Sequence, residues 1–229
     1  MKDVLGQAIY DYHYRLSPSK LYIHNKFGLP DIMPVETYFR EEEDMPPLEV
    51  EALELCKGSI LDIGSGAGSH ALYLQHNKQN VTALEISPLA SQVMKARGVK
   101  KIITADINTF TGQSYDTLLL MMNGIGLTTN LNGLSIFFQH AKTLLSHNGQ
   151  LIFDSSNVAY LYKNAIRPIN KYYGIIDFRY EYKRQKSSWF TWLYVDKKTL
   201  QKIAAAAGWI TEILIEDDHD QYLARLTLK

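Results

Sequence analysis

Short apolar runs alternate with helical patterns through the middle of the chain. The first run, residues 59–63, ends at glycines, which is typical of a buried parallel strand. Between the runs, apolar residues recur at helical spacing, and Ser87 followed by Pro88 indicates an N-cap and a first helical turn. The predicted strands cover residues 59–63, 81–86, 101–105, 116–121 and 149–154, and the predicted helices cover 68–77, a segment from Pro88, and 131–146. Strands that alternate with helices predict a mostly parallel α/β sheet.

The C-terminal part of the chain has a different pattern. Residues 196–207 predict a helix that ends at Gly208, and two strands follow at 209–215 and 221–228. A hairpin of this kind places one antiparallel strand in the sheet. The turn at 216–220 is rich in aspartate, which favours turns for backbone reasons, so we interpret it as a solvated turn and predict no metal site.

Two aromatic segments flank this pattern. Residues 1–57 are rich in tyrosine, proline and charge, and we expect them to form an N-terminal helical cover in front of a cofactor-binding domain at 58–229. Residues 157–195 predict an inserted β-hairpin. Its strands are expected at 172–182 and 188–195, with the turn near Ser187 and Ser188. The aromatic residues of both segments either cover a ligand site and exclude water from it, or pack the additions onto the core.

Composition narrows the class of protein. The chain has 229 residues, of which 46% are hydrophobic and 21% charged, as in a globular domain. Its 24 basic and 24 acidic residues balance, so the net charge does not favour a nucleic-acid partner. Cys56 is the single cysteine, the first residues lack the apolar region of a secretory signal, and no apolar run reaches the length of a membrane span. We therefore expect a cytoplasmic protein with no membrane or nucleic-acid partner, and the sequence predicts no oligomeric state.

The segment Asp62-Ile63-Gly64-Ser65-Gly66-Ala67-Gly68 joins a predicted strand to a predicted helix. Glycine permits positive φ angles and lets a ligand approach the backbone, and the helix start offers N–H groups to an electronegative atom. The Gly-x-Gly-x-Gly spacing differs from the Gly-x-Gly-x-x-Gly of dinucleotide-binding folds, and the Gly-Lys-Ser/Thr of phosphate-binding loops is absent. The loop therefore predicts a ligand site, but not for a dinucleotide.

Acidic residues end the next two predicted strands. Glu85 can accept hydrogen bonds from both hydroxyls of a ribose, as acidic residues do in dinucleotide folds, or it is an exposed charge at a strand end. Asp106 can accept the amino group of an adenine, or it is a helix N-cap. Together with the glycine loop, the two carboxylates predict an adenosine site.

Five segments together resemble the motifs of class I S-adenosylmethionine-dependent methyltransferases. They are Leu61–Gly68, Val81–Ser87, Ala105–Ile107, Ser114–Leu120 and Leu144–Leu151. The terminal hairpin is similar to the reversed last strand of that family. The resemblance implies a Rossmann-like, doubly wound, seven-stranded, mostly parallel sheet with a reversed C-terminal strand. It also implies that the chain is a methyltransferase with S-adenosyl-L-methionine as its cofactor.

The resemblance implies roles for the residues of the site. Gly64 and Gly66 would pass beneath the methionine moiety, and Asp62 would position the loop or bind the amino group through water. Glu85 would hold the ribose, while Asp106 and Ile107 would frame the adenine. The other candidate cofactor-binding residues are Ser65, Gly68, Ile86, Met122, Asn123, Arg40 and His70.

Arg40 and His70 each have two interpretations, and Asn123 is also a candidate for catalysis. Arg40 can hold the cofactor's carboxylate as a bidentate pair, or it pairs with the glutamates at 41–43. His70 lines the cofactor site or packs within its helix. Asn123 follows the fourth predicted strand and is the candidate catalytic residue, since ligands in open α/β sheets bind beyond the carboxyl ends of the strands.

The segment 121–126 lacks the Asn/Asp-Pro-Pro-Tyr/Phe sequence of enzymes that methylate nucleic-acid bases or glutamine. We therefore expect methyl transfer to a small-molecule acceptor, for which orientation of the two reactants supplies most of the catalysis. Three other functions stay open. The chain could bind the cofactor or S-adenosylhomocysteine without catalysis. It could be a nicotinamide-dependent oxidoreductase, which the loop spacing disfavours, or an aminopropyl transferase, for which 121–126 lacks an acidic cluster.

Overall fold

The computed structural model describes residues 2–163 and 167–229, and it forms two compact units. The first unit comprises residues up to 45, 62–110 and 177–190, and the second comprises 46–61, 111–176 and 191–229. Met1 of the expected cover and residues 164–166 of the expected hairpin segment lie outside the described residues. The expected boundary between an N-terminal cover at residues 1–57 and a cofactor-binding domain at 58–229 stays a prediction.

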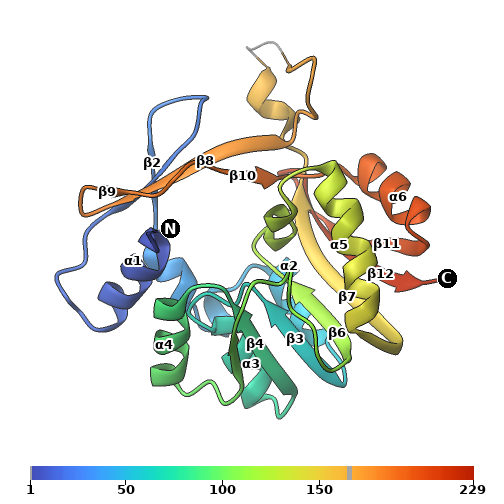
Figure 1. Ribbon diagram of the computed structural model, residues 1–229, viewed down its shortest axis with the longest axis horizontal. Coiled ribbons are helices and arrows are strands. Elements are labelled where there is room, and N and C mark those ends of the chain that lie inside the picture. The colour runs from blue at the N-terminus through green and yellow to red at the C-terminus, as the bar shows by residue number, and fades with distance from the viewer. Residues whose placement is uncertain (1, 164–166) are drawn as a thin grey trace. The chain divides into compact units, whose positions relative to one another are not determined.

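A seven-stranded sheet carries the α/β pattern, and its strand order is β11-β12-β7-β6-β3-β4-β5. The strands are β3 (Ser59–Ile63), β4 (Asn80–Glu85), β5 (Ile102–Thr104), β6 (Tyr115–Leu120), β7 (Leu145–Ser156), β11 (Trp209–Glu216) and β12 (Gln221–Leu228). β4 and β5 run parallel, as do β6 and β7, whereas β12 runs antiparallel to both β7 and β11. The Rossmann-like sheet with a reversed C-terminal strand is therefore confirmed, and Figure 1 labels most of its strands.

The helices of the α/β pattern lie where the apolar spacing predicts them. They are α3 (Ser69–His76), α4 (Pro88–Arg97), α5 (Leu131–Leu144) and α6 (Lys197–Ala206). Ser87 is the N-cap of α4, and its hydroxyl accepts a hydrogen bond from the N–H of Ala90 at 3.0 Å. The N-terminal segment adds α1 (Val4–His13), α2 (Pro47–Glu54) and two 3-10 helices, η1 (Val35–Phe39) and η2 (Glu42–Asp44). Among the described helices, none has both the length and the apolar character needed to cross a membrane.

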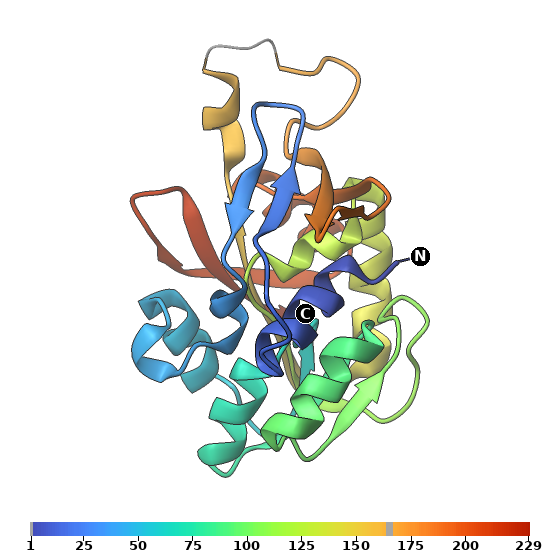
Figure 2. The ribbon, with the colours of Figure 1, turned by 90° about the vertical axis from the view of Figure 1, so that its left-hand side faces the viewer.

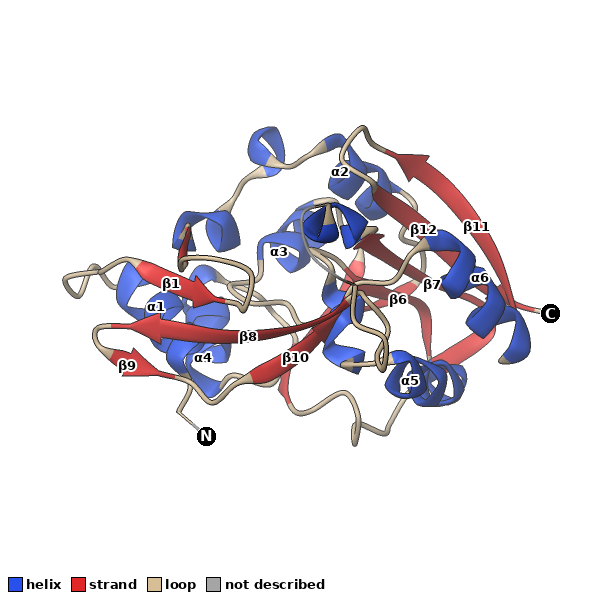
Figure 3. Ribbon diagram, turned by 90° about the horizontal axis from the view of Figure 1, so that it is seen from above, coloured by secondary structure: helices blue, strands red, loops and turns tan. Residues whose placement is uncertain are grey.

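A second, antiparallel sheet has the strand order β10-β8-β1-β2, and β9 pairs with β8. Its strands are β1 (Leu21–His24), β2 (Asp31–Met33), β8 (Ile175–Tyr182), β9 (Gln185–Lys186) and β10 (Phe190–Leu193). Leu21 lies opposite Tyr182, so a strand of the N-terminal segment pairs with a strand of the inserted hairpin. Figure 3 shows β1, β8 and β9 side by side, and Figure 2 shows the β1–β2 hairpin in blue. The N-terminal cover therefore contains strands that the expectation of a helical cover did not include.

The turn of the inserted hairpin lies earlier than predicted. Tyr182 pairs with Gln185, which leaves Lys183 and Arg184 as a two-residue turn with φ angles of 46° and 63°. Positive φ at both positions is typical of a type I′ turn, whose twist matches that of paired strands. The Lys183 ammonium lies 2.6 Å from a carboxylate oxygen of Asp11 in α1. The expected turn near Ser187 and Ser188 is therefore wrong. Lys183 and Arg184 are neither glycine nor asparagine, so the sequence does not mark this turn, and the ion pair of Lys183 joins it to a residue far away in the sequence.

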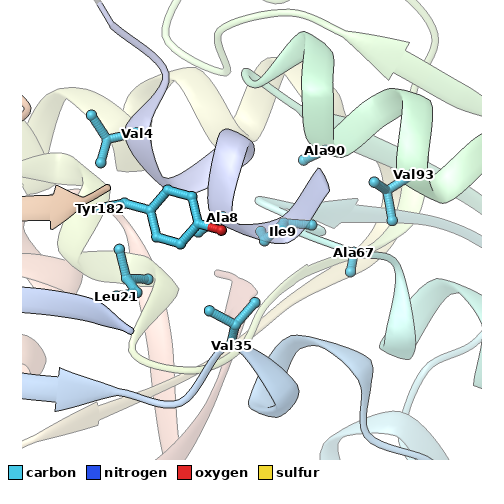
Figure 4. Packing of buried hydrophobic residues seen from close by; sticks show 9 residues of the cluster. All are labelled: Val4, Ala8, Ile9, Leu21, Val35, Ala67, Ala90, Val93 and Tyr182. Atoms are coloured by element: carbon cyan, nitrogen blue, oxygen red, sulfur yellow. The ribbon is translucent and has the colours of Figure 1, made fainter. Parts of the chain in front are cut away.

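One hydrophobic cluster of the first unit joins segments that are far apart in the sequence. Its buried members are Val4, Ala8, Ile9, Leu21, Val35, Ala67, Ala90, Val93 and Tyr182. Figure 4 shows these side chains gathered around α1 and α4, with Ala67 of the glycine loop among them. Gly6 permits the close approach of α1 to α4, since a Cβ there would overlap the hydroxyl of Ser87. The N-terminal helix and the glycine loop therefore share one core.

Candidate functional site

The glycine-rich loop lies between β3 and α3 in the first unit, and hydrogen bonds to β4 hold its backbone. The N–H groups of Gly64 and Ser65 both donate to the carbonyl of Leu84, at 2.8 and 3.3 Å. Gly64, Gly66 and Gly68 have φ angles of 75°, 55° and 86°, a region that L side chains rarely adopt. The backbone of the loop therefore requires all three glycines of the sequence pattern.

Two features of the loop suit a ligand with an amino group. A Cβ on Gly64 would meet no atom within 4 Å, so the backbone is open on that side. Asp62 is 1% exposed, and its Oδ2 has no hydrogen-bond partner among the described residues. Burial raises the pKa of the Asp62 carboxyl, and the nearby His70 acts against that shift. An unsatisfied buried acceptor costs about 1–3 kcal/mol, so a donor bound here would restore a missing hydrogen bond.

Glu85 ends β4, and its carboxylate is fixed by the loop and by the start of α4. Oε2 accepts from the N–H of Gly66 and Oε1 accepts from the N–H of Ser87, both at 2.8 Å. Burial raises the pKa of this carboxyl, whereas the backbone donors lower it. A carboxylate can accept about four hydrogen bonds, so these two contacts orient Glu85 without using all of its acceptor capacity.

The residues expected near an adenine also lie in the first unit. Oδ1 of Asp106 accepts from the main-chain and side-chain nitrogens of Asn108, both at 2.9 Å. This is a local turn, and no helix begins at Asp106. Ile107 is buried, whereas Ile86, directly after Glu85, is 66% exposed. Ile86 therefore offers an apolar surface beside a buried carboxylate, as mixed polar and apolar ligand sites do.

The remaining candidates of the first unit surround the loop. The hydroxyl of Ser65 donates to the carbonyl of Asp62 at 2.7 Å, and Gly68 is the N-cap of α3. A Cβ on Gly68 would lie 2.9 Å from side-chain atoms of Met94 and Val99, so this glycine is also required by packing. His70 is buried in the first turn of α3, and Arg40 is the half-buried residue that ends η1.

Tyr38 lies against the glycine loop, although it is not among the candidate cofactor-binding residues that the sequence indicates. Its ring carbon Cδ1 would be 3.0 Å from a Cβ on Gly66, so the ring lies against the glycine backbone. The carbonyl of Tyr38 accepts from the hydroxyl of Ser69 at 2.9 Å. Burial raises the pKa of the Tyr38 hydroxyl, and Tyr180 and Glu85 act in the same direction. The run Tyr38-Phe39-Arg40 was the available signal, but nothing local indicates that η1 contacts the loop.

Met122 and Asn123 lie in the second unit, between β6 and the 3-10 helix η3 (Gly124–Thr128). Their φ angles of 61° and 55° are uncommon for residues other than glycine and cost conformational energy. The hydroxyl of Ser156 donates to Oδ1 of Asn123 at 3.0 Å, and the indole N–H of Trp192 donates to its carbonyl at 3.0 Å. The Asn123 side chain therefore takes part in holding its own turn, and its catalytic role stays a prediction.

Asp154 of β7 supports the same turn from a fully buried position. Both of its carboxylate oxygens lie 2.9 Å from the N–H of Asn123, and the amide of Gln221 donates to Oδ2 at 2.7 Å. Burial raises the pKa of Asp154 to about 6, against these donors, and Glu49 adds to the rise.

Among the described residues, no group of three or more His, Cys, Asp or Glu side chains is arranged to hold a metal ion.

Comparisons with known proteins define the class. A family model described as a methyltransferase domain matches residues 61–153. A solved S-adenosylmethionine-dependent methyltransferase from Bacteroides fragilis, in complex with S-adenosyl-L-homocysteine, is 39% identical, with 99% of this chain and 95% of that chain covered and a TM-score of 0.92. The chain therefore belongs to the S-adenosylmethionine-dependent methyltransferases, and S-adenosylmethionine is its cofactor.

More distant structures share the fold alone. An S-adenosylmethionine-dependent methyltransferase from Clostridium acetobutylicum ATCC 824 has 14% identity and a TM-score of 0.60, with 81% of this chain and 93% of that chain covered. The amino pentose methyltransferase CalS10 from Micromonospora echinaspora has 14% identity and a TM-score of 0.56, with 80% of this chain and 92% of that chain covered. No curated protein matches the chain.

Proposed function

We propose that this methyltransferase transfers a methyl group to a small-molecule acceptor, and that the glycine loop of the first unit holds the cofactor. The observation that supports the placement is the unpartnered Oδ2 of Asp62, next to the loop in which Gly64 has an open backbone. A buried carboxylate is a strong acceptor for an ammonium group, and the methionine moiety of the cofactor carries one. The ammonium group would donate a hydrogen bond to Asp62 either directly or through a water molecule.

The other parts of the cofactor have matching residues in the same unit. Glu85 would accept from the ribose hydroxyls, and Ile86, Asp106 and Ile107 would frame the adenine. Arg40 would pair with the carboxylate of the methionine moiety, since a guanidinium binds a carboxylate through two parallel hydrogen bonds. The remaining candidates of the first unit that would shape the site are Ser65, Gly66, Gly68 and His70. Met122 and Asn123 belong to the second unit, and their cofactor-binding role stays a prediction from the sequence.

The cofactor, when bound, supplies a methyl group that the positive charge of its sulfonium already activates. The residues of the chain therefore act mainly by orienting the reactants and excluding water. Tyr38 covers Gly66, and burial raises the pKa of its hydroxyl and that of Tyr180, the latter to about 12. Both hydroxyls stay protonated at neutral pH, so they serve as hydrogen-bond donors and not as general bases.

The aromatic face of β8 supports an acceptor without negative charge. Side chains alternate along a strand, which places Phe178 and Tyr180 on one face and the charged residues Asp177, Arg179 and Glu181 on the other. The ring of Phe190 lies 5.0 Å from that of Tyr180 and 6.2 Å from that of Phe178, measured between centroids. Aromatic faces attract cations and apolar groups, so this surface suits an uncharged or cationic small molecule.

The cofactor placement is tested by substituting Gly64. Gly64 and Gly98 both have positive φ, 75° and 94°, and a Cβ on either would meet no atom within 4 Å. Gly64→Val and Gly98→Val therefore carry a similar backbone cost, on the order of 1–2 kcal/mol. We expect Gly64→Val to weaken S-adenosylhomocysteine binding by at least about tenfold in calorimetry, because the side chain would fill the open face of the loop. Gly98→Val should bind as the wild type does, and equal affinity for both variants would contradict the placement.

A further inference from the structure

Arg97, the last residue of α4, contacts the glycine loop. Its Nη1 donates to the carbonyl of Ala67 at 2.7 Å and lies 3.3 Å from the hydroxyl oxygen of Ser69. Burial lowers the pKa of the guanidinium, and Glu41 acts against that shift. Arginine keeps its charge in proteins even when partly buried. A cation is therefore held against the two residues that flank Gly68.

The same guanidinium contacts η1. Its Cζ lies 5.0 Å from the ring centroid of Phe39, a distance at which a cation is attracted to an aromatic face. The Ser69 hydroxyl that Arg97 approaches also donates to the carbonyl of Tyr38. Arg97 is therefore connected to η1 by two routes, one through the ring of Phe39 and one through Ser69. Tyr38, which lies against Gly66, is the neighbour of Phe39 in this short helix.

We propose that Arg97 is a positioning residue that couples the cofactor loop to η1, so that cofactor binding and the packing of Tyr38 against Gly66 favour each other. This inference rests on the proposed placement of the cofactor on the glycine loop. Arg97 acts through the carbonyl of Ala67 and the ring of Phe39. When one cation stabilises two segments together, ordering one segment favours ordering the other, and the coupling is reciprocal.

The chain offers a matched control for the loss of a positive charge. A cation at the C-terminal end of a helix interacts favourably with the helix dipole, and this effect alone would make Arg97 stabilising. Lys95 lies in the same last turn of α4 and is exposed. Lys95→Met therefore removes a charge from this helix end without touching the loop. Arg97→Met keeps a long side chain without charge, and Arg97→Lys keeps the charge without the planar fork of donors.

The experiment combines calorimetry with hydrogen exchange on the full chain, with S-adenosylhomocysteine as the probe. In the wild type, we expect the probe to slow amide exchange in residues 35–40 and 64–69 together. Arg97→Met should weaken binding by about tenfold, the loss of one charge-assisted hydrogen bond. It should also lose the slowing at 35–40 while keeping it at 64–69. Arg97→Lys should lie between these results, and Lys95→Met should match the wild type.

Each other outcome is decisive. If Arg97→Met binds the probe as the wild type does, or if both segments still respond together, Arg97 does not couple them, and the cofactor placement is unaffected. If Gly64→Val also binds normally, the placement itself is wrong. If circular dichroism shows that Arg97→Met is unfolded, Arg97→Lys decides the question, because wild-type affinity and exchange in that variant would overturn the coupling.

Discussion

Asp154 is a carboxylate that the folded protein buries completely, and its pKa of about 6 lies above the ordinary value of 3.8 because of that burial. The folded state therefore binds this proton more tightly than the unfolded state does. Protonated Asp154 stabilises the fold below about pH 4, and the contribution is lost as the pH rises through about 6. The shift corresponds to about 3 kcal/mol at most.

The pH dependence can be isolated with Asp154→Asn, which cannot ionise. We expect the free energy of unfolding of the wild type, relative to this variant, to fall by up to about 3 kcal/mol between about pH 4 and pH 7. Urea denaturation at several pH values measures both proteins. Two stability curves that run parallel over this range would contradict the assignment of the titration to Asp154.

At the scale of single residues, the sequence predicts the loop better than its surroundings. Gly64, Gly66 and Gly68 have the positive φ angles that their pattern requires, because the constraint is local to the backbone. Tyr38 and Asp154 are important for contacts made with residues distant in the sequence, namely Gly66 and Asn123. Such contacts leave no periodic signal, so local pattern could not identify either residue.

At the scale of elements, a hydrogen bond joins the N-cap of α1 to the N-cap of α4. Asp3 caps α1 by accepting from the N–H of Gly6 at 2.9 Å, and Ser87 caps α4. The hydroxyl of Ser87 also donates to the second carboxylate oxygen of Asp3 at 2.5 Å. One hydrogen bond therefore links the starts of two helices that are separated by most of the first unit's sequence.

This link predicts coupled effects of cap substitutions. Asp3→Ala and Ser87→Ala should each destabilise the protein by about 1 kcal/mol, the usual cost of losing an N-cap. The double variant should lose at least about 0.5 kcal/mol less than the sum, because the hydrogen bond between the caps is removed only once. Chemical denaturation of the four proteins completes the cycle. Strict additivity would show that the two caps act independently.

The strands of the antiparallel sheet show where element prediction stops. β1 and β2 are short, and Pro30 and Pro34 flank β2, so neither strand has a strong local pattern. Their pairing partner β8 follows far along the chain. The turn at Lys183 and Arg184 was missed for the same reason, because the ion pair of Lys183 joins it to Asp11, far away in the sequence. The helices and parallel strands were predictable because their apolar periodicity is complete within each segment.

At the scale of the whole molecule, 24 basic and 24 acidic residues leave no net charge. Enzymes that hold a nucleic-acid backbone do so with an excess of positive charge. We therefore expect methyl label from tritiated S-adenosylmethionine, incubated with the protein and a cell extract, to appear in dialysable compounds. The Gly64→Val variant is the control for transfer by other enzymes in the extract. Label that depends on the wild-type protein but stays with nucleic acid or protein would contradict a small-molecule acceptor.

The shared core of the first unit also limits how this enzyme can be recombined with its relatives. Val4, Ala8 and Ile9 of α1 pack with Ala67 of the loop, with Ala90 and Val93 of α4, and with Tyr182 of β8. Exchanging the N-terminal segment for that of another methyltransferase would replace only one side of this packing. A chimera would need matched substitutions in α4 and β8 to keep the glycine loop in place. The N-terminal segment and the glycine loop are therefore expected to change together in laboratory evolution.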